Sequence, residues 1–276
     1  EIILVNDGST DESEKIILDF NHPKIKYFRQ ENQGAAAARN FGIQQASNEY
    51  IALLDADDLW DKDYLNSMAS IIKEHPSEHV FACAINLENK KKDIVPSNYS
   101  IENMEEISIQ NYFEASYKQT LISSSSVVIH KDVFKKVGYF DTKILSGQDT
   151  DYWIRLGIHC PVVFLPEYLV TYRYSPTSLF RSGVAIEDKL NPDKFKEEEK
   201  QNSALKKFLD LNRYSLALYA KNEGNLAYYN KYTQELNPKN INFKQRLLLN
   251  SPIWVFKMFR NIQVFLDRFG IHISSF

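Results

Sequence analysis

The first 55 residues alternate between short apolar runs and helix-forming runs, and this alternation is the strongest constraint on the fold. Strands are predicted over residues 1–5, 25–29 and 50–54, and helices over residues 9–20 and 35–46. A capping box of Ser9 and Glu12 is expected to open the first helix. Because parallel neighbouring strands need crossover connections, the alternation predicts a parallel, doubly wound α/β sheet.

Later segments extend this pattern and then change it. Strands are predicted over residues 80–87, 123–130, 162–165 and 169–174, and helices over residues 59–74, 131–137 and 149–156. From about residue 193 the sequence is rich in Lys and Glu with helical periodicity, and Gly224 divides it into two helices. We therefore expect an α/β domain over residues 1–185, a helical extension over 186–250 and an amphipathic C-terminal helix over 251–276.

Composition excludes several classes of protein. The 276 residues are 43% hydrophobic and 25% charged, as in globular proteins rather than disordered or fibrous chains. The formal net charge of -3 provides no overall basic field for binding nucleic acid. Cys83 and Cys160 are the only cysteines, so a disulfide framework is not expected and a reducing compartment is favoured. No apolar run approaches the roughly 18 residues of a membrane span.

Acidic residues follow the predicted strands at the edge where ligands of such sheets bind. Asp7 follows the first strand, and Asp55, Asp57 and Asp58 follow the third. Two carboxylates one residue apart form a hard oxygen site that suits Mg²⁺ or Mn²⁺, with a diphosphate completing the coordination. The alternatives are a solvated turn or a helix cap. Asp57 or Asp58 is also able to cap the following helix, in which case one carboxylate is structural while its neighbour is functional.

Several motifs together resemble family 2 of the inverting glycosyltransferases, which have the GT-A fold. The matching segments cover about residues 1–180 in the family's order: 3–11, 32–34, 38–40, 54–58, 138–141, 148–156 and 172–173. The resemblance implies transfer of a sugar from a nucleotide sugar, most often a UDP-sugar, to an acceptor hydroxyl. It also implies inversion of configuration at the anomeric carbon.

The resemblance assigns a role to each matching residue. Asp7 corresponds to an aspartate that contacts the nucleobase, Arg39 to a basic residue near the nucleotide, and Asp55 to the ribose-contacting aspartate. Asp57 corresponds to the ligand of the Mn²⁺ or Mg²⁺ ion that bridges the diphosphate, and Asp149 to the catalytic base. The alternatives are a turn residue for Asp7, a solvated helix residue for Arg39 and a helix N-cap for Asp149.

Other positions depart from the family pattern or leave a role open. Gln148 stands where the family usually has Glu, and an amide cannot act as a base. Ser175 follows the segment after which many members have a metal-binding His, so the third metal ligand is unassigned. Trp153 and Arg155 match the acceptor region, and Trp153 would serve equally well in core packing.

The chain begins directly in a strand, whereas family members have another strand and helix before this point. We interpret the sequence as lacking that first strand and helix, and we assign the implied activity to the complete protein. The alternative is a noncatalytic nucleotide-sugar-binding relative or an inactive fragment.

The composition, rich in Lys, Asn, Ile and Tyr, and the resemblance together suggest bacterial surface polysaccharide synthesis. The expected acceptor is a glycan or a lipid-linked glycan, and the expected location is the cytoplasm. Residues 244–276 contain five basic residues and one acidic residue, a net charge of +4. The helix within this segment is expected either to pack on its own domain or to contact the inner face of the plasma membrane.

Overall fold

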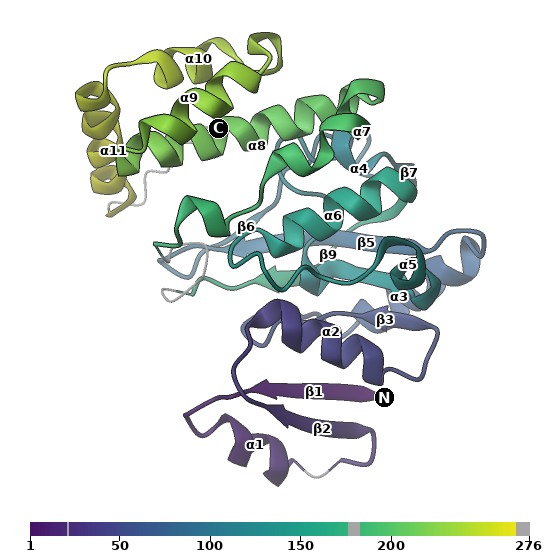
Figure 1. The fold of residues 1–276 in the computed structure, drawn as a ribbon. Helices are drawn as coiled ribbons and strands as arrows, with labels where there is room; N and C mark the ends of the chain where they lie inside the picture. Colours follow the sequence, from purple (N-terminus) through teal and green to yellow (C-terminus); the bar gives the residue numbers. More distant parts are fainter. Residues whose placement is uncertain (21, 176–182, 269–276) are drawn as a thin grey trace.

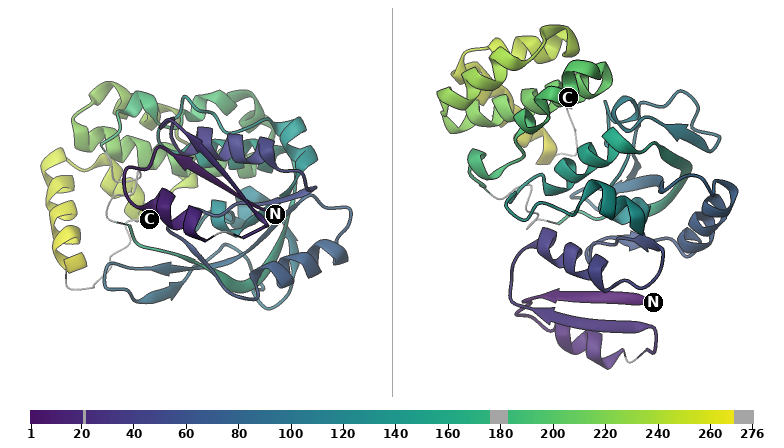
Figure 2. Two further views of the ribbon diagram at one scale, coloured as in Figure 1. Left: turned by 90° about the horizontal axis from the view of Figure 1, so that it is seen from below. Right: turned by 45° about the vertical axis from the view of Figure 1, so that its right-hand side comes forward.

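The computed structural model describes residues 1–20, 22–175 and 183–268. These residues form two β-sheets flanked by helices, with a group of helices at one end (Figure 1). The smaller sheet lies at the opposite end from the C-terminal helices (Figure 2). Helix α2 (Ala35–Gln45) lies between the smaller sheet and the larger one (Figure 1).

The smaller sheet consists of β1 (Ile2–Asp7) and β2 (Ile25–Gln30), which pair in parallel and are connected by α1 (Ser13–Asp19). The predicted strand, helix, strand order is therefore confirmed. The predicted capping box is wrong, because α1 begins at Ser13 without a side-chain cap. The turn is held instead by Asn6 Oδ1, which accepts a hydrogen bond from the Ser9 amide at 2.8 Å.

The larger sheet has the strand order β3-β8-β5-β9-β4, with β6 added beside β5 and β7 beside β9. The strands are β3 (Tyr50–Ala52), β4 (Leu59–Trp60), β5 (Val80–Glu88), β6 (Ile94–Pro96), β7 (Ser108–Gln110), β8 (Val127–His130) and β9 (Val162–Tyr172). Among the described strands of this sheet, only β5 and β9 pair in parallel. Strand directions are thus more mixed than expected, because β8 runs between β3 and β5 antiparallel to both.

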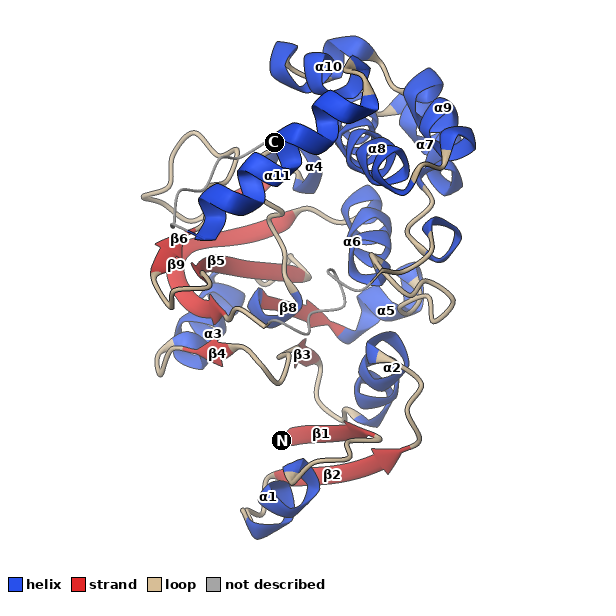
Figure 3. Ribbon diagram, turned by 90° about the vertical axis from the view of Figure 1, so that its left-hand side faces the viewer, coloured by secondary structure: helices blue, strands red, loops and turns tan. Residues whose placement is uncertain are grey.

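Helices cover both faces of the larger sheet (Figure 3). Side chains of β5 alternate between the faces, as the pleat requires. Phe81 and Cys83 pack in the cluster that contains residues of α3 (Tyr64–Glu74). Val80, Ala82 and Ala84 pack in the cluster on the other face, which is covered by α4 (Tyr112–Ala115), α5 (Lys131–Val137) and α6 (Gln148–His159).

Three predicted elements differ from the structure. Leu59 and Trp60, expected to start a helix, form the short strand β4, which pairs with β9. The segments 162–165 and 169–174, expected to be two strands, form the single strand β9. The expected strand over residues 123–130 begins instead with a 3-10 turn, η1 (Ser124–Ser126).

The remaining elements are helical, as the sequence predicts. They are η3 (Ile186–Asp188), η4 (Pro192–Phe195), α7 (Lys196–Gln201), α8 (Ser203–Glu223), α9 (Leu226–Glu235), η5 (Pro238–Asn240), α10 (Phe243–Asn250) and α11 (Ile253–Arg268). Gly224 ends α8 in a left-handed conformation, which confirms the predicted break. Phe208 of α8 lies against the rings of Tyr112 and Phe113, so the helices pack directly on the α/β part.

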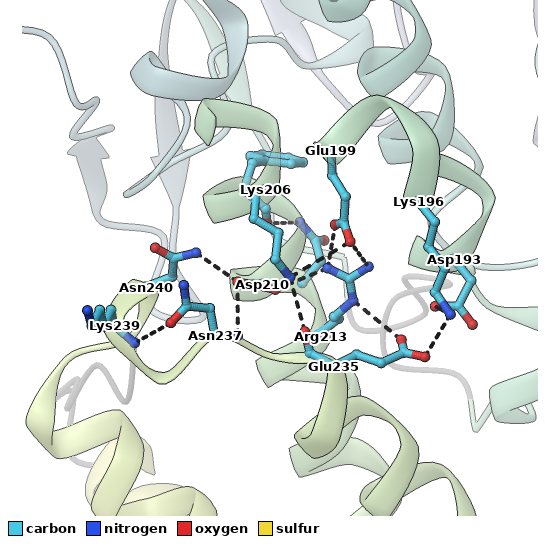
Figure 4. Close-up of polar contacts among 12 residues, drawn as sticks. Asp193, Lys196, Glu199, Lys206, Asp210, Arg213, Glu235, Asn237, Lys239 and Asn240 are labelled. Atoms are coloured by element: carbon cyan, nitrogen blue, oxygen red, sulfur yellow. Dashed lines mark hydrogen bonds and ion pairs between the residues drawn. The ribbon is translucent and has the colours of Figure 1, made fainter. Parts of the chain in front are cut away.

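Arg213 of α8 links three helices through ion pairs (Figure 4). Its side chain is fully buried, and Nη1 lies 2.7 Å from Glu199 of α7 and 3.0 Å from Asp210 of α8. Nε lies 3.7 Å from Glu235 of α9. Lys206 contacts Asp210 at 2.6 Å, which adds a second cation to the buried carboxylate.

Helix α11 extends from α10 along one side of the molecule (Figure 3). Phe256 is buried in the helical core, whereas Trp254 and Met258 are 67% and 46% exposed. Within the described ranges, no helix has both the length and the apolar character needed to cross a bilayer.

Candidate active site

A cleft of about 2010 Å³ lies between the α/β part and the helical extension. The loop after β3, the ends of β5 and β9 and the start of α6 line one wall, and α8, α10 and α11 line the other. Five of the seven predicted site residues line it: Arg39, Asp55, Asp57, Asp149 and Trp153. The other two, Asp7 and Arg155, are not among the described residues that line the cleft.

Arg39 and Asp55 form an ion pair in the lining of the cleft. Arg39 comes from α2, and Asp55 follows β3. Nε and Nη2 of Arg39 both donate to Asp55 Oδ1, at 3.2 and 2.6 Å. Nη1 is buried and has no hydrogen-bond partner in the described chain, so one strong donor is left for a ligand.

Asp58 anchors the acidic loop. Its Oδ2 accepts a hydrogen bond from Ser125 Oγ at 2.6 Å, and its Oδ1 accepts one from the Arg173 amide at 3.1 Å. Ser125 Oγ also accepts a hydrogen bond from the Asp55 amide at 3.1 Å. Burial raises the pKa of Asp58 to about 6, against the opposing effect of these hydrogen bonds. Asp58 therefore holds the loop in place, and the predicted capping role is wrong because α3 begins only after Asp63.

Asp57 differs from Asp55 and Asp58 because its side chain is exposed in the cleft. No hydrogen bond or ion pair to its carboxylate occurs within the described ranges. The described residues also contain no group of three or more His, Cys, Asp or Glu side chains that could together hold a metal ion. The described protein residues alone therefore do not complete a metal site. One free carboxylate nevertheless fits Mg²⁺ or Mn²⁺, which commonly combine one or two carboxylates with substrate phosphates and water. Ser175 lines the same cleft.

Asp149 is the second residue of α6, and its carboxylate lines the cleft. The N-cap of α6 is Gly147, with a left-handed φ of 86°, so the alternative role of Asp149 as N-cap is wrong. Oδ1 of Asp149 accepts hydrogen bonds from the amide and the hydroxyl of Thr150, at 2.7 and 3.4 Å. These bonds hold the carboxylate at the start of the helix. Gln148 lines the cleft beside it.

Asp7 connects two strands to the turn that opens α2. Its Oδ1 accepts hydrogen bonds from Gln30 Nε2 at 2.7 Å and the Gln33 amide at 2.9 Å. Its Oδ2 accepts one from the Gly34 amide at 2.8 Å. Asp7 therefore bonds a distant turn rather than its own backbone, and its contact with a nucleobase stays a prediction.

Trp153 and Arg155 lie on different sides of α6 and have different surroundings. Trp153 is 2% exposed and packs edge-on against Phe140, so it contributes to the core while touching the cleft. Arg155 donates to Asp151 at 2.9 Å and to the carbonyl oxygens of Val137 and Tyr139 at 2.8 Å each. These bonds fasten α6 to the loop after α5, which is a structural role.

The wall formed by the helical extension was not predicted as part of the site. It places polar side chains of α8 in the cleft at helical spacing: Asn212, Ser215, Tyr219 and Asn222. Residues three or four positions apart share one face of a helix. This spacing of polar residues is the sequence pattern from which the second wall of the cleft could have been predicted. Lys189 and Lys244 also line the cleft.

Comparison with known proteins gives the family. Residues 1–138, half of the chain, match the sequence model of glycosyl transferase family 2. The chain therefore belongs to this family, as its motifs predict.

Two curated relatives illustrate the range of this similarity. An uncharacterized glycosyltransferase of Rickettsia typhi is 31% identical over 179 residues, which cover 63% of this chain and 54% of the relative. The poly-beta-1,6-N-acetyl-D-glucosamine synthase of Staphylococcus epidermidis is 33% identical over 159 residues, which cover 55% of this chain and 38% of the synthase. The chain thus corresponds to about half of the first relative and to a smaller part of the second.

Among solved structures, S. aureus TarS residues 1–349 in complex with UDP-GlcNAc match with a TM-score of 0.66 and 20% sequence identity. The match covers 90% of this chain and 77% of that one. It confirms the predicted fold class, a GT-A type α/β fold with a central sheet flanked by helices.

Proposed function

We propose that the complete protein transfers a sugar from a nucleotide sugar, with a UDP-sugar as donor, to an acceptor hydroxyl with inversion. The observation that carries this proposal is that Asp149, Asp57 and the Arg39 and Asp55 pair line one cleft. A proton acceptor, an oxygen ligand for a metal and polar groups for a nucleotide thus share one solvent-accessible space.

Arg39 and Asp55 are assigned to the nucleotide. The unpartnered Nη1 of Arg39 offers a charged donor to a ribose or phosphate oxygen, and the Asp55 carboxylate accepts from a ribose hydroxyl. Asp7 is assigned to the nucleobase. The solved structure of TarS with UDP-GlcNAc supports a UDP-sugar as the class of donor.

Asp57 is assigned to a divalent ion, Mn²⁺ or Mg²⁺. Such an ion would act as a Lewis acid that stabilises the negative charge on the departing diphosphate. The exposed carboxylate of Asp57 supplies one ligand, whereas one oxygen of Asp55, Oδ1, already accepts two hydrogen bonds from Arg39. The proposed roles, ribose contact for Asp55 and metal ligand for Asp57, therefore match the different surroundings of the two aspartates.

Asp149 is assigned as the catalytic base. The acceptor oxygen forms a bond to the anomeric carbon while the bond from that carbon to the diphosphate oxygen breaks, and Asp149 takes the hydroxyl proton. A single displacement from the face opposite the leaving group inverts the configuration. Gln148 cannot replace Asp149 in this step because its amide is not basic.

For the pathway, we propose bacterial surface polysaccharide synthesis on the cytoplasmic side, with a glycan or lipid-linked acceptor. The similarity to a poly-beta-1,6-N-acetyl-D-glucosamine synthase supports the polysaccharide. The exposed apolar residues of α11 support peripheral membrane contact near such an acceptor.

The test compares Asp149→Asn with Asp132→Asn. Asp132 is the second residue of α5, as Asp149 is of α6, but it is not one of the residues that line the cleft. With a panel of UDP-sugars that includes UDP-N-acetylglucosamine, Asp149→Asn should reduce UDP release roughly 10²-fold or more, while UDP affinity measured by calorimetry changes little. Asp132→Asn should change neither value. Wild-type protein that binds UDP without turnover would favour the noncatalytic relative.

A further inference from the structure

Lys189 is a cation of the cleft to which the proposed function gives no role. Lys189 lines the cleft, and its ammonium lies 4.3 Å from the centroid of the Tyr219 ring. Nζ is also 3.5 Å from Ser146 Oγ. The acidic side chains of the described chain form no ion pair with it, and residues 176–182 contain no Asp or Glu.

Burial lowers the pKa of Lys189, because desolvation disfavours its charged form and no nearby carboxylate opposes this effect. Lys194, which is not one of the residues that line the cleft, does have carboxylate partners: its Nζ lies 2.8 Å from Asp151 and 3.3 Å from Asp141. A partly buried ammonium without a counter-ion favours an anionic ligand in the space beside it.

The backbone fixes Lys189 beside α6. The amide of Leu190 donates to the Ser146 carbonyl at 3.0 Å, and the amide of Ser146 donates to the Asp188 carbonyl at 3.3 Å. A Cβ atom at Gly147 would lie 3.1 Å from Leu190 Cβ, so the two segments are in close contact. Ser146 precedes Asp149 by three residues, and these bonds therefore anchor Lys189 to the element that carries the proposed base.

The opposite side of this space suits a hydroxylated ligand. Tyr219 presents its ring below the ammonium, and its hydroxyl is held by a 2.6 Å hydrogen bond to the Val184 carbonyl. Ser215 and Asn222 line the cleft from the same face of α8. The ring supports the Lys189 ammonium from below, and the hydroxyl of Ser215 and the amide of Asn222 offer hydrogen bonds to the hydroxyl groups of a sugar or polyol.

We propose that Lys189 and Tyr219 form an acceptor subsite for an anionic glycan or polyol. The acceptor would carry a phosphate or carboxylate close to the hydroxyl that receives the sugar. This inference rests on the proposed function, in which the acceptor delivers its proton to Asp149.

The test measures binding of glucose 6-phosphate and glucose to the full chain by ligand-observed NMR, with and without saturating UDP and Mg²⁺. UDP occupies the donor site, so a phosphate that still binds does so elsewhere. Wild-type protein should bind glucose 6-phosphate at least about tenfold more tightly than glucose in both conditions, since a charge-assisted contact to a phosphate contributes this much. Lys189→Gln should remove the difference, and Lys189→Arg should retain most of it.

Lys207→Gln is the matched control. Lys207 Nζ lies 4.0 Å from the centroid of the Tyr117 ring, so the variant removes the same kind of pair from a residue outside the cleft lining. Equal binding of glucose 6-phosphate by wild type and Lys189→Gln would overturn the subsite. A loss of UDP affinity in Lys189→Gln without a change in glucose 6-phosphate binding would assign Lys189 to the donor site. That result would also overturn the proposed acceptor subsite. UDP binding by the wild type tests the proposed function separately.

Discussion

Arg39 directs two of its three guanidinium nitrogens to a single oxygen of Asp55, and the third has no hydrogen-bond partner among the residues that the structure describes. The two hydrogen bonds measure 3.2 and 2.6 Å, and the free nitrogen, Nη1, is buried. The Arg39 guanidinium also lies 5.6 Å from the centroid of the Phe140 ring, which limits its movement. The pair is thus positioned before a ligand binds, with one donor unused.

Replacing Arg39 by Lys should weaken UDP binding roughly tenfold, because an ammonium cannot hold Asp55 and still present a second fixed donor. Calorimetric titration with UDP measures this. Arg29→Lys serves as the control, since Arg29 pairs with Glu14 on the surface with 57% of its side chain exposed. Identical UDP affinities for Arg39→Lys and wild type would show that Nη1 does not contact the nucleotide.

Asp57→Asn should remove the dependence of UDP binding on a divalent ion. In the wild type, Mn²⁺ should strengthen UDP binding relative to EDTA, because the free carboxylate and the diphosphate share the ion. In the variant the two affinities should nearly coincide. Asp61→Asn, which changes an exposed aspartate near the same loop, should behave like the wild type. If Mn²⁺ strengthened UDP binding by Asp57→Asn as much as by the wild type, the metal would have ligands other than Asp57.

The positions of Asp55, Asp57 and Asp149 could be predicted from the sequence, because each depends on local pattern. The two aspartates follow an apolar strand, and Asp149 starts a helix with a clear apolar face. Their different contacts could not be predicted. Only the folded chain brings Ser125 to the acidic loop, 67 residues beyond Asp58.

Two of the elements that were predicted incorrectly, β9 and β4, have a form that depends on distant partners. Two strands were expected over residues 162–165 and 169–174, but β9 continues through Pro166 because β5 pairs with Leu165 and then with Tyr168. The irregular pairing leaves Pro166 outside the ladder, where its missing N–H costs nothing. Trp60 likewise joins a strand only because β9 is present as its partner.

Arg213→Met should lower the free energy of unfolding by roughly 3 kcal/mol, because it leaves the buried Asp210 carboxylate without one of its two cations. Denaturant titration followed by circular dichroism measures the change. Lys200→Met removes an exposed ion pair with Glu197 within α7, and it should cost less than about 0.5 kcal/mol. Equal effects of the two variants would mean that the buried ion pairs of Figure 4 contribute no more than surface charge.

The helices at the C-terminal end combine exposed apolar side chains with charged side chains that are all basic. Phe243, Leu247, Trp254, Met258 and Phe259 are each between 46% and 71% exposed. Residues 236–266 contain five Lys or Arg and no Asp or Glu, in a chain whose net charge is -3. Leu247 and Phe259 also line the cleft, so this surface is continuous with the proposed site.

The double variant Trp254→Ser and Met258→Ser should reduce binding to liposomes that contain anionic lipid by several fold in a cosedimentation assay. Two exposed apolar side chains would no longer enter the lipid interface, while the basic residues would remain. Wild-type binding should also fall when salt is added, because salt screens the attraction between the basic residues and lipid head groups. Ile16→Ser with Leu18→Ser is the control, since these side chains of α1 are 64% and 56% exposed. If both double variants cosediment like the wild type, α11 has only a structural role.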